Sequence, residues 1–324
     1  MSSKTERRAV LVAIGLALLA TSARAEEAWR PDRIIDVHLH GYATQEGWHD
    51  LPMGVGAHHV PAEFAERRPP PTPSAHRDAI LGAMERNGIV LGLMSAGHFS
   101  DPNVGEAWKT PIAEGRILLG ATHRRVLDDR SRSAVEKEAR AGELRFLGEW
   151  GLVYDGLEPD DPRLAEAWAL AERLDLPVGV HTGTAAPGSA NRGEPGFRNR
   201  LGNPALLEDV LVRHPKLRLW LMHAGYPYLE DTIAMLHQYP EVYADISPLN
   251  WLLPEAEFRR YVGALVTAGF ADRLMFGTDA MRWPDAIDVA VERTARLPFL
   301  TEDQKRDLFH RNAERFFRLE SGAE

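Results

Sequence analysis

The chain has 324 residues, of which 38 are basic and 47 acidic, so its formal net charge is −9, and it contains no cysteine. The excess of acidic residues argues against nucleic acid or an anionic membrane surface as the partner. The lack of cysteine excludes a disulfide framework and a lipid-modified cysteine anchor. With 44% hydrophobic residues, the chain can bury one large core, and an α/β barrel of this length is commonly one domain.

The N-terminal residues have the pattern of a targeting segment that is removed from the mature protein. Basic residues at positions 4, 7 and 8 precede an apolar run over 9–20, and Ala-Arg-Ala at 23–25 supplies a cleavage site. We therefore expect a signal peptide over 1–25 and a periplasmic or secreted protein that begins at Glu26. The pair Arg7 and Arg8 also fits a twin-arginine signal. An uncleaved anchor is the alternative, although the apolar run is short for a membrane span.

Cleavage would remove four basic residues and one acidic residue, which takes the formal charge from −9 to −12. A protein this acidic is expected to meet a small-molecule substrate, not nucleic acid, and to keep no stable membrane anchor after cleavage. A homo-oligomer is left open.

Eight short apolar runs alternate with helical stretches along the rest of the chain. The runs cover residues 34–40, 88–96, 117–123, 146–151, 177–182, 217–224, 242–246 and 274–279. Between them, segments such as 162–174, 204–214, 229–239 and 255–268 have helical periodicity. Eight such repeats predict a (β/α)8 TIM-type barrel as a single domain over 26–324. An open doubly wound sheet is the alternative, but it would need a glycine-rich phosphate turn after the first strand, where none is found.

Polar residues recur at the ends of these runs, and they are His38, His40, Glu149, His181, His223, Asp245 and Asp279. Barrel enzymes place their active sites at the carboxyl ends of the strands. Side chains alternate along a strand, so His38 and His40 should face the same way. Asp36 shares that face by the same period, but deeper, where a structural hydrogen bond is expected. Imidazole and carboxylate ligands suit zinc or a similar divalent ion.

Five short motifs stand out along the chain: Asp-Val-His-Leu-His at 36–40, Val-His-Thr-Gly at 180–183, Met-His-Ala-Gly at 222–225, Phe-Gly-Thr-Asp at 276–279 and Asn-Ala-Glu-Arg-Phe at 312–316. By these motifs the chain resembles the metal-dependent amidohydrolase superfamily, specifically its amidohydrolase-related (type 2) branch. The resemblance implies that the minimal metal site is His38, His40, His181 and Asp279. It implies that His223 is either a ligand of a second metal or a hydrogen-bonding electrophile beside the first.

Glu149 bears on the number of metals. Dinuclear members of the superfamily place a bridging carboxylate or a carboxylated lysine at the end of the fourth strand, where this chain has Glu149. The alternative is that Glu149 orients His181 or an arginine without touching a metal. The sequence therefore predicts a divalent metal cofactor, zinc by its ligands, with one or two ions left open.

The chemistry follows from the ion. A bound divalent metal lowers the pKa of its water towards about 7 and polarises a substrate carbonyl. Asp279 can accept the proton of the water and deliver it to the leaving group, and His223, if it is no ligand, can stabilise the oxyanion. We expect a hydrolase of an ester, lactone or amide. A non-oxidative decarboxylase of the same branch and a non-catalytic binding protein are the alternatives.

Two loops are candidates for substrate selection. The segment 42–73 is long for a connection between strand and helix, which is typical of a lid or binding loop. The segment 183–203 carries Arg192, Arg198 and Arg200, here called the loop arginines, and Arg282 follows the last strand. Because arginine recognises carboxylate in bidentate fashion, these four residues predict an anionic group, such as a carboxylate, on the substrate. Ordinary solvation of surface arginines is the alternative.

Overall fold

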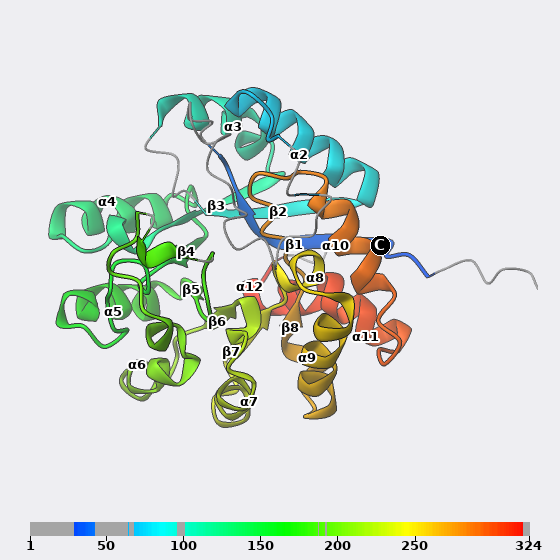
Figure 1. Cartoon of the computed structure of the whole chain (residues 1–324). Coiled ribbons are helices and arrows are strands. Elements are labelled where there is room, and N and C mark those ends of the chain that lie inside the picture. Colours follow the sequence, from blue (N-terminus) through cyan, green and yellow to red (C-terminus); the bar gives the residue numbers. More distant parts are fainter. Residues whose placement is uncertain are drawn as a thin grey trace, which may run out of the picture.

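The computed structural model describes residues 29–42, 64, 68–95, 101–186, 188–191 and 193–319. The predicted signal peptide and Arg192 therefore lie outside the described residues. Eight parallel strands form one sheet in the order β1 to β8, with helices around it (Figure 1). This arrangement is a TIM barrel, as predicted. The strands are β1 (Ile34–His40), β2 (Ile89–Ser95), β3 (Ile117–Ala121), β4 (Phe146–Trp150), β5 (Val178–His181), β6 (Leu219–Met222), β7 (Val242–Asp245) and β8 (Leu274–Met275).

The helices lie in the connections between the strands and after the last strand. They are α2 (Pro73–Asn87), α3 (Pro102–Ala113), α4 (Asp129–Arg140), α5 (Ala165–Leu174), α6 (Glu208–Arg213), α7 (Leu229–Gln238), α8 (Leu249–Leu252), α9 (Glu255–Thr267), α10 (Ala286–Ala295), α11 (Glu302–Arg306) and α12 (Asn312–Phe317). Helix α2 shows how the sequence sets such limits, because Thr72 caps its first turn and Gly88 ends it in the left-handed conformation. Within the described residues, no helix has both the length and the apolar character needed to cross a bilayer.

The barrel closes where β8 meets β1, although the ladder of β8 has only two residues. The Val37 amide donates to the Phe276 carbonyl at 3.0 Å, and the Asp279 amide donates to the His38 carbonyl at 2.8 Å. Residues 276–279 thus run beside β1 without being a regular strand. These contacts place Asp279 next to the histidines of β1.

The first strand contains a bulge that corrects one expectation about its faces. Its register against β2 shifts between Asp36 and Leu39. As a result, Ile35 and Val37 pack in the barrel interior while Leu39 packs in the outer core. Alternation puts Asp36 on the face opposite Ile35 and Val37, so it does not share the face of His38, because the bulge adds a residue between them. Its carboxylate makes the expected structural hydrogen bonds instead, one of them from the Thr278 hydroxyl at 2.6 Å.

The barrel interior is packed by pairing large rings with glycines. A Cβ atom on Gly120 would lie 2.1 Å from the Phe146 ring, and one on Gly179 would lie 2.4 Å from the Trp220 ring. Both rings are fully buried, so the absence of a side chain at these glycines is what makes room for them.

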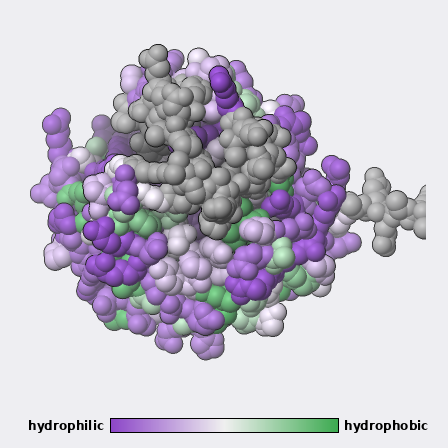
Figure 2. All heavy atoms as spheres, viewed as in Figure 1, coloured by the Kyte–Doolittle hydropathy of each residue, from purple (hydrophilic) through white to green (hydrophobic). Residues whose placement is uncertain are grey.

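Helix α12 is here called the C-terminal plug. It closes the end of the barrel at which the strands begin. Phe316 and Phe317 belong to the same apolar cluster as the interior residues of the strands, and their rings lie 5.8 and 5.1 Å from that of Trp220. The buried Arg218 donates to the Phe316 carbonyl and to the Asp175 carboxylate. The last helix is therefore tied into the core. On the outside, Figure 2 shows hydrophilic side chains over much of the described surface, with smaller hydrophobic areas between them.

Candidate metal centre

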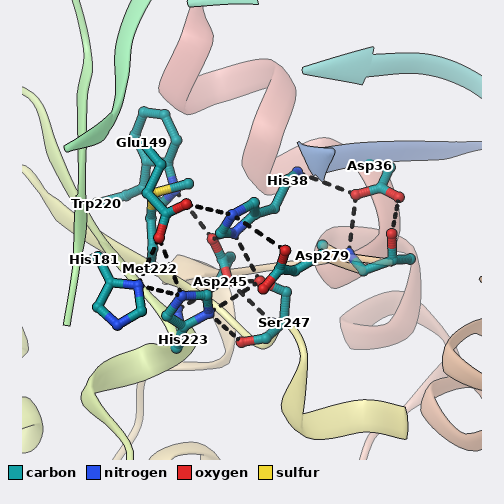
Figure 3. A network of polar contacts seen from close by, with 12 residues as sticks. Asp36, His38, Glu149, His181, Trp220, Met222, His223, Asp245, Ser247 and Asp279 are labelled. Atoms are coloured by element: carbon teal, nitrogen blue, oxygen red, sulfur yellow. Dashed lines mark hydrogen bonds and ion pairs between the residues drawn. The ribbon is translucent and has the colours of Figure 1, made fainter. Parts of the chain in front are cut away.

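The structure brings the six predicted metal ligands together at the carboxyl ends of five strands or their continuations. His38 and His40 come from β1, Glu149 from β4, His181 from β5, His223 from the residue after β6, and Asp279 from the segment after β8. Figure 3 shows His38, His181, His223 and Asp279 around the carboxylate of Glu149. All are buried or nearly so.

Glu149 lies between two groups of ligands. Its Oε2 atom is 3.5 Å from His38 Nε2 and 3.2 Å from His40 Nε2. Its Oε1 atom is 2.6 Å from His181 Nδ1 and 3.4 Å from His223 Nε2. One carboxylate thus faces a histidine pair with each oxygen. This position fits a carboxylate that bridges two ions, and the 2.6 Å contact with His181 also fits the alternative in which Glu149 orients that histidine.

Asp279 completes the group on the β1 side. Its Oδ1 atom is 3.3 Å from His40 Nε2 and 3.9 Å from His38 Nε2. That oxygen is buried without a hydrogen-bond partner. A buried carboxylate oxygen with no partner is costly, and a cation in the space it faces would supply one.

Three of the histidines have a hydrogen-bond partner on the side of the ring that faces away from the cluster. His38 Nδ1 lies 2.8 Å from the Ser247 hydroxyl, His223 Nδ1 lies 2.8 Å from the Ser247 carbonyl, and His181 Nε2 lies 3.2 Å from the Thr184 carbonyl. A carbonyl can only accept, so the nitrogens of His181 and His223 that face it carry the proton. The other ring nitrogen then presents its lone pair to the cluster, as metal-binding histidines do.

The distances fit a metal. Two ligand atoms bound to a tetrahedral zinc ion at about 2.0–2.1 Å lie about 3.3–3.4 Å apart. The contacts of His40 Nε2 with Glu149 at 3.2 Å and with Asp279 at 3.3 Å are close to this value. Three groups of described ligand atoms are compact enough to hold an ion, and Glu149 belongs to two of them: His38, His40 and Glu149; Glu149, His181 and His223; and His38, His223 and Asp279. The residues present therefore fit one or two divalent ions.

The electrostatics of the cluster favour charged carboxylates. Burial alone would raise the pKa of Glu149, but its close contacts with the surrounding histidines hold that pKa well below its usual value. Burial opposes charge on His40, yet the nearby carboxylates of Asp279 and Glu149 raise its pKa to about 9. The carboxylates thus attract cations to this site.

Two of the ligands have backbone conformations that residues other than glycine rarely adopt. The φ angle is +63° at His223 and +46° at Asp279, with Ala224 at +47°. Such conformations cost free energy and persist at functional sites where the surroundings impose them. They turn both side chains into the barrel mouth directly after the strands end.

The predicted substrate-binding arginines are not part of this cluster as described. Arg198 and Arg200 are exposed, and Arg198 donates to the carbonyls of Pro195 and Phe197 in its own loop. Arg282 forms a hydrogen bond with Tyr42 that lowers the pKa of Tyr42, although burial raises it to about 12 overall. Substrate binding by these arginines stays a prediction.

Sequence reasoning missed the roles of several residues near the cluster. Asp245 is buried and its Oδ2 atom lies 3.3 Å from His38 Nδ1, whereas the sequence marked it only as a polar strand end. The Tyr154 hydroxyl is 3.4 Å from His181 Nδ1. Trp251 follows a strand end like a substrate contact, but it is fully buried and donates to the Thr278 carbonyl at 2.7 Å. The Asp-Ile-Ser pattern at 245–247 was the one available signal for the first of these.

Comparison with known families decides the assignment. Residues 35–319 match the amidohydrolase family, which covers all six ligands. The chain belongs to the amidohydrolase family. This family is metal-dependent, in agreement with the metal-binding geometry of the cluster. A comparison with curated proteins found no match.

Solved structures with the same fold include both hydrolases and decarboxylases. A probable 2-pyrone-4,6-dicarboxylic acid hydrolase from Acinetobacter baumannii with citric acid bound is 13% identical, with a TM-score of 0.59 over 89% of this chain and 100% of that chain. An amidohydrolase from Burkholderia multivorans with bound zinc is 19% identical, with a TM-score of 0.58 over 89% and 99%. A 5-carboxyvanillate decarboxylase from Sphingomonas paucimobilis is 17% identical, with a TM-score of 0.55 over 89% and 99%. At these identities the likeness establishes the fold, so the reaction of this amidohydrolase has to be argued from its own site.

Proposed function

We propose that this amidohydrolase is a metal-dependent hydrolase that cleaves an ester, lactone or amide with water. One observation carries the proposal: the two oxygens of Glu149 face two different histidine pairs, at 3.2 Å from His40 Nε2 and 2.6 Å from His181 Nδ1. A carboxylate between two ligand groups could hold two ions, and a two-metal site would suit attack by water on a carbonyl.

The positions of the residues assign them to two ion sites. His38, His40 and Asp279 would hold one ion, His181 and His223 the other, and Glu149 both. When bound, the metal supplies Lewis acidity, which activates water at neutral pH and polarises a carbonyl oxygen. Zinc is the proposed metal, since imidazole and carboxylate are ligands it accepts.

Asp279 is the proposed acid–base residue. Its unpartnered Oδ1 atom faces the cluster, where it can accept a proton from the attacking water and return it to the leaving group. His223 is better placed as a ligand than as a free electrophile, because its Nδ1 is engaged by the Ser247 carbonyl and its Nε2 points to Glu149 and His181.

The proposed substrate is a small molecule that carries a carboxylate. The loop arginines and Arg282 support this, as does the citric acid in the Acinetobacter baumannii hydrolase of the same fold. A strongly acidic protein repels anions at long range, so local guanidinium groups are the means by which it would attract one.

The proposed location is the periplasm or the medium, with Glu26 as the mature N-terminus. The basic, apolar and Ala-Arg-Ala order of residues 1–25 supports export. Mass spectrometry of the protein from its native host would test this, and an intact N-terminus at Met1 on the bulk of the protein would contradict it.

The experiment that tests the reaction is a substrate screen with metal-loaded protein. Lactones, esters, amides and aromatic acids are supplied to the zinc-loaded protein, and CO2 release is followed in parallel with acid release. Hydrolysis of a carboxylated lactone, ester or amide without CO2 is the expected result. Release of CO2 from an aromatic acid, with no hydrolysis, would replace the proposal with decarboxylation.

A further inference from the structure

The end of β7 carries a buried polar network that the proposed reaction does not use. Asp245 and Ser247 have no exposed surface, and both lie behind the histidines of the cluster (Figure 3). Polar groups this deeply buried are retained where they have a specific partner. Their partners here are histidines from both ligand groups.

Ser247 touches one histidine from each side of Glu149. Its hydroxyl lies 2.8 Å from His38 Nδ1, and its backbone carbonyl lies 2.8 Å from His223 Nδ1. The same hydroxyl donates to Asp245 Oδ1 at 2.6 Å. Because its one proton is engaged there, the hydroxyl oxygen accepts from His38, which fixes the proton of His38 on Nδ1.

The Asp245 carboxylate connects the members of this network through both of its oxygens. Its Oδ1 atom accepts from the backbone amides of His223 at 3.1 Å and Ser247 at 3.0 Å. Its Oδ2 atom accepts from Trp220 Nε1 at 3.1 Å and lies 3.3 Å from His38 Nδ1. One carboxylate thus contacts the side chain of His38 and the backbone of His223.

The two histidines are also in contact with each other. The rings of His38 and His223 are stacked, with centroids 5.0 Å apart and an interplanar angle of 25°. A shift of either ring would therefore disturb the other as well as the shared residues behind them.

We propose that Ser247 and Asp245 are positioning residues that hold His38 and His223 as one unit, so that the two metal subsites on either side of Glu149 are organised together. This inference rests on the two-metal site of the proposed function. It adds that neither subsite keeps its affinity when the Ser247 hydroxyl is lost, because that oxygen lies 2.8 Å from His38 Nδ1 and 3.5 Å from His223 Nδ1.

The test is the metal affinity of Ser247→Ala, measured by titration with Co2+ against a competing chelator and by the absorption spectrum of bound Co2+. Ligand-orienting residues contribute about 10- to 100-fold to metal affinity, so a loss of this size is expected for both ions, with an altered spectrum. Ser247→Thr restores a hydroxyl and should recover part of the affinity. Circular dichroism and thermal unfolding of the metal-free proteins check that each variant folds.

Thr294→Val is the matched control, because it removes a buried hydroxyl that has no hydrogen-bond partner and therefore orients no metal ligand. It should bind both ions like the wild type. Wild-type affinity in Ser247→Ala, or a loss confined to one ion, would overturn the proposal while leaving the proposed function intact. A wild-type protein that binds fewer than two ions would overturn the two-metal function and this inference with it.

Discussion

In the proposed two-metal site, replacing Glu149 with glutamine should leave one ion bound instead of two. The amide has the shape of the carboxylate, but it has one oxygen instead of two and no charge. In the structure both oxygens are engaged, Oε2 at 3.2 Å from His40 Nε2 and Oε1 at 2.6 Å from His181 Nδ1. Whichever way the amide turns, its NH2 group faces one pair of histidines and cannot bind an ion there.

The size of the effect follows from the lost charge. A unit charge about 4 Å from another contributes roughly 4 kcal/mol at an effective dielectric constant of about 20. Each 1.4 kcal/mol is about tenfold in affinity, so the weaker ion should bind about 10³-fold less tightly. The fold should persist, since the substitution changes no volume.

Equilibrium dialysis over a range of free zinc, followed by elemental analysis, measures both ions. Glu143→Gln is the matched control, because it makes the same chemical change at an exposed position just before β4. Two ions bound by Glu149→Gln, with affinities within about tenfold of the wild type, would show that Glu149 does not bridge.

Three further predictions follow from the same structure. Asp279→Asn should keep its fold but lose roughly 10²- to 10⁴-fold in turnover, and a loss within about threefold, with fold and metal content unchanged, would show that Asp279 is not the base. Gly179→Ala, whose Cβ would lie 2.4 Å from the Trp220 ring, should lower the free energy of unfolding by about 1–3 kcal/mol. Gly82→Ala is the control and should not lower it, because its nearest neighbour would be 3.6 Å away. Equal stability of the two variants in denaturant unfolding would refute the packing argument. Alanine at one or more of the loop arginines should cost about 10- to 150-fold in kcat/KM on an anionic substrate and less on its neutral ester, and if all three variants match the wild type, these arginines are only solvated.

The barrel and the cluster were predictable because both follow from repetition along the chain. The run 34–40 predicted β1 with its limits unchanged. The rule that barrel sites lie at strand ends then selected seven polar residues, which include the six that the structure brings together in the cluster. What such reasoning uses is local: a period of two in each strand and the order of the strands. Neither requires knowledge of which residues touch across the barrel.

The remaining features depend on contacts that a single segment does not encode. The bulge in β1 is set by its register with β2, so the period of two placed Asp36 on the wrong face. The contact of Ser247 with both His38 and His223 joins three strand ends that are far apart in the sequence. Trp251 follows a strand end, and only its full burial and its hydrogen bond to the Thr278 carbonyl show it to be structural.

The C-terminal plug determines when this protein can finish folding. The barrel closes between Asp36 and Thr278, which are 242 residues apart, and Phe316 and Phe317 then fill its lower end. The first strand pairs with β2 on one edge, but its partner on the other edge is missing until residues 276–279 have been synthesised, and contacts this distant in sequence form slowly. During synthesis, His38 and His40 remain without the residues that fix their rings. Metal binding at the proposed site consequently requires the closed barrel. Loss of a few residues from the plug would therefore weaken metal binding at the opposite end of the barrel.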